Sequence, residues 1–134
     1  STKGCISGGT MMAYIQITQP RHVALMVRDL DAADWFYGKV LGLPKCDRPL
    51  NFPGIWYEVG SFQLHVMVHA DAQPPLYNLQ KWGRNAHIAF AIKDLSAAKT
   101  ALSAAGITFQ MSASGRPALF VRDPDGNVIE LSES

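Results

Sequence analysis

The sequence has no surplus of either charge, only two cysteines and no long apolar run. Lysine and arginine number 12 against 11 aspartates and glutamates, so no basic surface predicts binding to nucleic acid or to an anionic membrane. No apolar run approaches the roughly 20 residues that a membrane-spanning helix needs. Cys5 and Cys46 could pair, but with Cys5 in an N-terminal extension we expect two free thiols in a reducing compartment. These absences favour a soluble cytoplasmic protein.

The chain has the size and composition of one folded domain. It has 134 residues, of which 48% are hydrophobic and 17% charged, which suits a single core but not two independent ones. Residues 1–12 lack the basic and apolar regions of a secretory signal. We interpret them as an expression remnant or a loose extension, and residues 13–134 as a single domain.

Two segments of this domain repeat each other. "HVALMVRDL" occupies residues 22–30, and "HIAFAIKDL" occupies residues 87–95, 65 positions later. Each segment is followed by apolar residues at helical spacing: Leu30, Ala33, Tyr37 and Val40 in the first copy, and Leu95, Ala98, Leu102 and Ala105 in the second. Asp29 or Asp31 can cap the first helix and Asp94 or Ser96 the second. Each half therefore begins as strand, turn and helix.

Strand-forming segments follow each helix. Residues 54–69 read as two strands around Gly60, and residues 118–131 as two strands joined by the turn Asp123-Pro124-Asp125-Gly126. Shorter strands are expected at 44–48 and 107–111. The sequence thus predicts an α+β fold of two βαβββ modules in tandem, at about 20–69 and 86–132, whose paired curved mixed sheets enclose a cleft. The loop 70–86 connects the modules.

Four polar side chains share the face of these strands that points away from the helices. Side chains alternate along a strand, so His22 and His87 point away from the apolar core face. His65 and Glu130 have the same parity and are also 65 residues apart. The repeat predicts that His22, His65, His87 and Glu130 meet in one cleft.

Three imidazoles and one carboxylate form a plausible metal site. Such ligands suit Zn, Fe, Ni, Co or Mn, and on an octahedral ion they leave two positions for water or substrate. His69 lies farther along the same face and is expected at the rim. Parity does not fix which way Trp56 faces, and Arg84 and Arg122 are expected at the surface.

The pattern resembles the vicinal oxygen chelate superfamily, which includes glyoxalase I, fosfomycin-resistance transferases, extradiol dioxygenases and bleomycin-resistance proteins. "HVALMVRDLDAADWFYGKVLGL" and "HIAFAIKDLSAAKTALSAAGI" look like its two opening units, and "FVRDPDGNVIEL" like its closing hairpin. The resemblance implies that His22, His87 and Glu130 are metal ligands. His65 falls where glyoxalase I carries a carboxylate that is both ligand and base, so His65 and Glu130 are the candidate catalytic residues.

The resemblance implies a glyoxalase-like metalloenzyme that chelates a small oxygen-rich substrate on one divalent metal per chain. Two alternatives stay open: an extradiol-type dioxygenase that uses Fe(II), and a non-catalytic drug-binding protein of the bleomycin-resistance kind. The resemblance also favours a homodimer with sites at the subunit interface, possibly with modules exchanged. The connection of 17 residues from 70 to 86 permits pairing of the modules within one chain or across two.

Overall fold

The structure is a computed structural model that describes residues 13–134. The predictions for residues 1–12, including that for Cys5, lie outside the described residues. The first module contains β1 (His22–Val27), α1 (Leu30–Asp34), η1 (Trp35–Val40), β2 (Lys45–Cys46), β3 (Gly54–Val59) and β4 (Phe62–Val68). The second contains η2 (Trp82–Arg84), β5 (His87–Ile92), α2 (Leu95–Ala104), β6 (Gln110–Met111), β7 (Ala118–Arg122) and β8 (Val128–Glu133).

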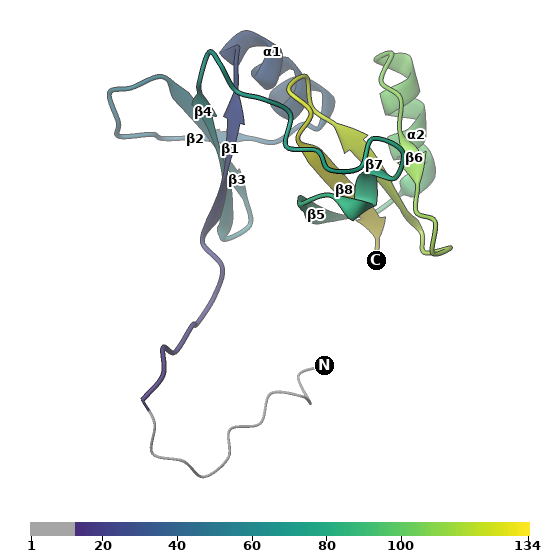
Figure 1. Ribbon diagram of the computed structural model, residues 1–134, viewed down its shortest axis with the longest axis horizontal. Coiled ribbons are helices and arrows are strands. Elements are labelled where there is room, and N and C mark those ends of the chain that lie inside the picture. Colours follow the sequence, from purple (N-terminus) through teal and green to yellow (C-terminus); the bar gives the residue numbers. More distant parts are fainter. Residues whose placement is uncertain (1–12) are drawn as a thin grey trace.

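The two modules have the same strand order. The first sheet runs β1-β4-β3-β2 and the second β5-β8-β7-β6. In each sheet the first strand lies parallel to the last, and the other neighbours are antiparallel. Figure 1 shows the first sheet, in purple to teal, beside the second, which ends in yellow. The predicted α+β fold of two tandem βαβββ modules with mixed sheets is therefore confirmed.

Each opening strand leads into a helix that begins after an aspartate. The Asp29 carboxylate accepts a hydrogen bond from the Asp31 backbone N–H, and Asp94 accepts one from Ala97, which satisfies N–H groups that lack a helical partner. The first helix differs from the single α-helix expected, because it continues after Asp34 as the π-helix η1. Two adjacent aromatic residues of this π-helix, Phe36 and Tyr37, are both buried.

The core lies on the strand faces that the sequence predicts. Alternate residues of β1 and β5 are the more buried ones. Val27, Leu64 and Ile129 belong to one apolar cluster that draws on both modules. β8 is buried on both faces, since Val128 and Glu130 are also nearly inaccessible. A side chain on the polar face of β8 is therefore held in place by its surroundings.

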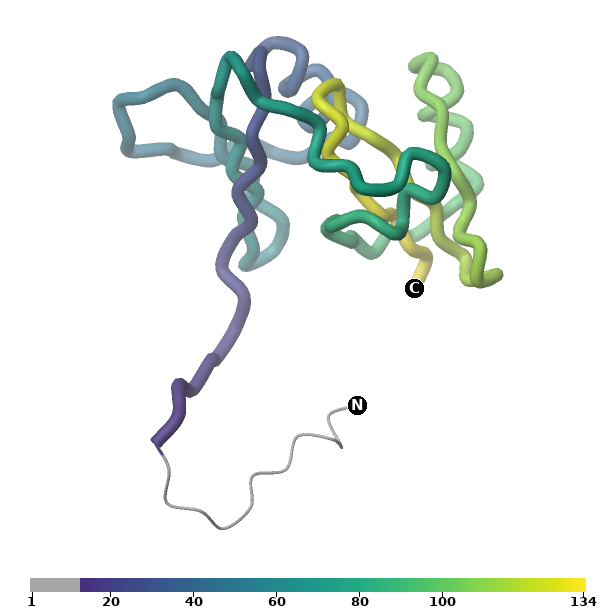
Figure 2. Tube along the Cα trace, in the orientation of Figure 1, coloured from purple at the N-terminus to yellow at the C-terminus, as the bar shows by residue number. Residues whose placement is uncertain are grey.

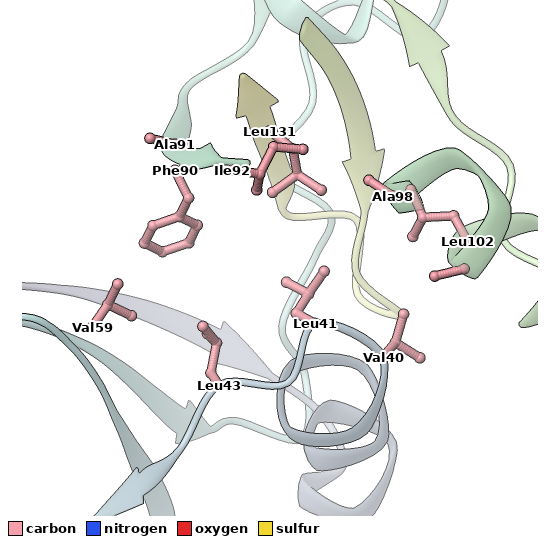
Figure 3. Close-up of a pocket in the computed structure, with 11 residues that line it drawn as sticks. Val40, Leu41, Leu43, Val59, Phe90, Ala91, Ile92, Ala98, Leu102 and Leu131 are labelled. Carbon is pink, nitrogen blue, oxygen red and sulfur yellow. The ribbon is translucent and has the colours of Figure 1, made fainter. Parts of the chain in front are cut away.

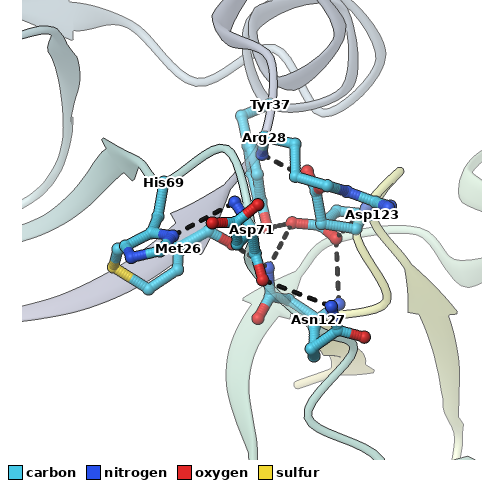
Figure 4. Close-up of polar contacts among 9 residues, drawn as sticks. Met26, Arg28, Tyr37, His69, Asp71, Asp123 and Asn127 are labelled. Carbon is cyan, nitrogen blue, oxygen red and sulfur yellow. Dashed lines mark hydrogen bonds and ion pairs between the residues drawn. The ribbon is translucent and has the colours of Figure 1, made fainter.

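The β7–β8 turn ties the second module to the first through polar contacts (Figure 4). The Tyr37 hydroxyl donates to Asp123 Oδ2 at 2.6 Å, and Arg28 Nε donates to Asp125 Oδ1 at 2.8 Å. The Asn127 side-chain amide donates to the Met26 carbonyl. The predicted turn is confirmed, with Asp123 Oδ1 accepting from two turn N–H groups. Its carboxylates thus bind the other module as well as shape the turn.

An apolar cavity of about 300 Å³ lies between the modules. Leu41 and Leu43, which follow η1, line one side of it, and Phe90 and Leu131 line another (Figure 3). No titratable side chain lines this cavity within the described chain. It is therefore part of the packing between modules and has no chemistry of its own.

Residues 13–21 leave β1 and run away from both sheets (Figure 2). No helix in the described part of the chain is long and apolar enough to cross a membrane. Cys46, on β2, has no disulfide partner within residues 13–134.

Candidate metal centre

The first pair of predicted ligands, His22 and His65, lies on adjacent parallel strands. Their rings stack with centroids 4.1 Å apart. The indole of Trp56, directly opposite His65 on β3, stacks on His65 at 4.0 Å. His65 is thus held between an imidazole and an indole, and it is only 8% exposed.

His65 is a neutral imidazole with a defined tautomer. Its Nε2 lies 2.8 Å from the carbonyl oxygen of the Gln63 side chain, so Nε2 carries the hydrogen and Nδ1 the lone pair. Burial, and then the charges of His22 and Arg48, lower the pKa of His65 below its ordinary value. A neutral ring with a free lone pair is the form that binds a metal or accepts a proton.

The second pair, His87 and Glu130, lies on strands β5 and β8. His87 Nδ1 is 2.7 Å from the backbone carbonyl of Asn85, so Nδ1 carries the hydrogen. His87 Nε2 lies 3.1 Å from Glu130 Oε1. At this distance the two atoms can share a hydrogen bond donated by a protonated ring, or can bind one metal ion side by side.

The spacing of this second pair suits a metal. A nitrogen and an oxygen bound at right angles to one ion, each about 2.1 Å from it, would be about 3 Å apart. The carbonyl that orients His87 is the kind of partner that fixes the tautomer of metal-binding histidines. His87 and Glu130 are therefore spaced as two neighbouring ligands of a divalent ion would be.

Asn85 supports His87, and sequence reasoning missed it. Its side chain is buried and accepts hydrogen bonds from the backbone of Tyr77 and Asn78. The same side chain donates to the carbonyls of Asn78 and Trp82. Asn85 thereby fixes the end of the 70–86 loop, and with it the carbonyl that orients His87.

Glu130 is held from two sides. Its Oε1 faces His87, and its Oε2 accepts from Arg116 Nη1 at 3.1 Å. The Glu130 side chain is 7% exposed. Two cationic or polar partners thus hold an almost buried carboxylate in one orientation.

The structure forms the two pairs but does not bring them together. Within residues 13–134 no three His, Cys, Asp or Glu side chains are placed to hold one ion. The prediction that His22, His65, His87 and Glu130 form one metal site therefore stays a prediction, with pairing across two chains still open. His69 lies in the turn after β4, where its Nδ1 accepts from the Asp71 backbone, away from both pairs.

This chain is similar in sequence and in fold to known proteins. Residues 19–131 match the Glyoxalase/Bleomycin resistance protein/Dioxygenase superfamily. The chain belongs to this superfamily. "Glyoxylase I 4" from Arabidopsis thaliana is 27% identical over 124 residues, which covers 87% of this chain and 71% of that protein.

Solved structures of the glyoxalase superfamily share the fold. Lactoylglutathione lyase from Agrobacterium tumefaciens is 25% identical, with a TM-score of 0.65 over 88% of this chain and 95% of that one. A glyoxalase/dioxygenase from Nostoc punctiforme matches with a TM-score of 0.76 at 24% identity, over 96% of this chain and 99% of that one. The latter likeness shows the fold alone.

Within this glyoxalase fold, three residues near the ligand pairs escaped sequence reasoning: Trp56, Arg48 and Arg116. A constant shift of 65 residues pairs Trp56 with a core residue of β7. The register instead makes Phe120 its counterpart, because Phe120 lies opposite Glu130 as Trp56 lies opposite His65. The second hairpin has one residue more, so a constant shift of 65 residues could not fix the face of Trp56. The two arginines lie in loops, where strand periodicity gives no signal.

Proposed function

We propose that this chain is a metal-dependent enzyme of the glyoxalase kind, acting on a small oxygen-rich substrate. The observation that carries the proposal is the His87–Glu130 pair, in which an imidazole nitrogen oriented by the Asn85 carbonyl lies 3.1 Å from a carboxylate oxygen, the spacing of two ligands on one ion. His22 and His65 complete a ligand set suited to Zn, Fe, Ni, Co or Mn. When bound, the ion would polarise two substrate oxygens and stabilise negative charge that develops on them.

A second copy of the chain completes the site in this proposal. Each chain carries His22 with His65 on one sheet and His87 with Glu130 on the other, and the two pairs lie apart. In a symmetric dimer the first pair of one copy can meet the second pair of the other, so each dimer has two equivalent sites. A homodimer is therefore part of the proposal.

The residues of the chain have distinct roles in the reaction. His65 holds its Nδ1 lone pair ready either to bind the ion or to accept a proton from the substrate. Trp56 covers one face of His65 and limits the access of water. Glu130 is held in one orientation by Arg116.

The two alternatives, an extradiol-type dioxygenase and a drug-binding protein, make different demands on the residues of the site. Two histidines and one carboxylate would also suit Fe(II) in an extradiol-type dioxygenase, which metal identification separates from the other chemistry. A groove for a cationic drug would need acidic walls. The cavity beside the second pair has Lys81, Arg84 and Arg116 among its lining residues and no carboxylate in the described chain, which disfavours drug binding.

Metal stoichiometry tests the proposal. The protein, prepared without a metal-affinity column, is expected to bind about one divalent ion per chain by elemental analysis. Glu130→Gln and His87→Ala should each lose most of the metal and keep the circular dichroism spectrum of the wild type. His69→Ala is the matched control, because it removes an imidazole outside both pairs, and should keep the metal. Unchanged stoichiometry in both site variants would refute the proposal.

A further inference from the structure

Arg48 in the first module and Arg116 in the second come from loops and reach the faces that carry the ligand pairs. Arg48 lies in the loop between β2 and β3, and Arg116 in the corresponding loop between β6 and β7. The two loops are equivalent in the repeat, since the strand orders of the two sheets are the same. The arginines therefore lie in matching loops, Arg48 near the start of its loop and Arg116 near the end of its own.

Arg48 lies over the same face of the first sheet as His65. A Cβ added to Gly54 would come within 2.7 Å of Arg48 Nη2, and Gly54 has the strand parity of Trp56, which stacks on His65. The guanidinium also donates to the Phe52 carbonyl and lies 4.5 Å from the centre of the Phe52 ring. Gly54 thus leaves the space that the guanidinium fills.

Two nitrogens of Arg48 are buried without a partner. Within residues 13–134, Nε and Nη2 have no hydrogen-bond acceptor and are shielded from solvent. A guanidinium keeps its charge at any ordinary pH, and a buried charge without an acceptor is costly. A site of this kind is satisfied by an oxyanion, which accepts from two guanidinium nitrogens at once.

Arg116 presents its charge beside the second pair. Nη1 donates to Glu130 and Nε to the Ser114 hydroxyl, while the side chain remains 54% exposed. It borders a cavity of about 540 Å³ to which Lys81 and Arg84 also contribute, and Trp82 and Phe120 give the cavity an aromatic wall. The volume is in the range of small-molecule sites, and the described lining has positive charge only.

We propose that Arg48 and Arg116 determine the substrate class: a small molecule that carries a carboxylate or phosphonate group next to an apolar part. The inference rests on the proposed function, because in the dimer Arg48 of one copy and Arg116 of the other flank the same four ligands. Arg48 supplies its two unpartnered nitrogens to the anion, and Arg116 supplies the donors that Glu130 does not use. The aromatic wall receives the apolar part.

Anion binding to the metal-free protein tests this inference. Phenylphosphonate and phenylacetate serve as probes in isothermal titration calorimetry at low ionic strength, and the stronger binder identifies the anionic group. Arg48→Gln and Arg116→Gln should each weaken binding by about tenfold or more, as expected for lost hydrogen bonds to a charged group. Lys93→Gln is the control, because it removes the same charge at the far end of β5.

The outcomes separate the anion site from the metal site. Equal weakening in all three variants would mean bulk charge alone and would overturn the inference, as would wild-type affinity in either arginine variant or no binding of either probe. Arg48→Gln touches no proposed ligand and should keep its metal stoichiometry. Loss of metal binding in the wild type with intact anion binding would refute the proposed function and leave the arginine pair standing.

Discussion

His65 distinguishes the proposed chemistry from that of glyoxalase I, which carries a carboxylate at this position. Its ring is held between His22 and Trp56, and its Nε2 is engaged by Gln63. A histidine bound to a metal is a poor base, because the lone pair that would take a proton is already used. The chemistry of the site therefore depends on whether a carboxylate or an imidazole stands at this position.

We expect His65→Glu to turn over the methylglyoxal–glutathione hemithioacetal faster than the wild type, which should be slow or inactive. The new carboxylate adds a base and a negative charge next to the ion. The measurement is loss of hemithioacetal by absorbance, with His69→Glu as the control for an added charge outside the site. Robust turnover by the wild type would contradict this reading of His65.

At the scale of elements, the β7–β8 turn is the principal polar connection between the modules. Burial, followed by the charge of Asp123, raises the pKa of Tyr37 well above its ordinary value. The hydroxyl therefore stays protonated and donates to Asp123 at neutral pH. This single bond links η1 of the first module to the hairpin that carries Glu130.

Tyr37→Phe should lower the free energy of unfolding by about 1–3 kcal/mol, the usual loss for a hydrogen bond to a buried charged group. Urea unfolding followed by fluorescence measures the change. Tyr77→Phe is the matched control, because Tyr77 is 94% exposed, and it should shift stability by no more than about 0.5 kcal/mol. Identical unfolding midpoints for Tyr37→Phe and the wild type would rule out this role of the hydroxyl.

The sequence predicts the features that local interactions determine. It does not predict the features that depend on contacts between distant residues. Helix caps at Asp29 and Asp94 and the strand faces of His22 and His87 follow from local periodicity, and the structure confirms them. The π-helix at Trp35–Val40 could not be predicted, because packing against the core selects it. The facing of Trp56 stayed open because the register of a hairpin depends on turn length, which one extra residue alters.

At the scale of the whole molecule, exchange of subunits distinguishes a site shared by two copies from a site within one chain. His22→Ala and His87→Ala each damage a different half. In a mixed dimer one shared site would receive both damaged halves, and the other would receive both intact halves. Mixing the two metal-free variants, then adding metal, should restore about a quarter of the wild-type metal content if subunits redistribute at random.

Sedimentation of the same mixture checks that dimers are present at micromolar concentration. Mixing His22→Ala with Glu130→Gln should restore metal to the same extent, whereas His87→Ala with Glu130→Gln should restore none, since both changes damage the same half. Recovery in this last mixture, or no recovery in the first two, would exclude the shared site.

The parallel pairing of the first and last strands in each module also sets the order of events during synthesis. β1 has no sheet partner until β4 has been made, and β5 has none until β8 follows. The first sheet can close while the ribosome is still translating the second half, as domains generally do. Tyr37, however, gains Asp123 only when the C-terminal hairpin emerges. A nonsense codon before Asp123 would therefore release a closed first sheet with an uncovered apolar flank, a product for chaperones and proteases to remove.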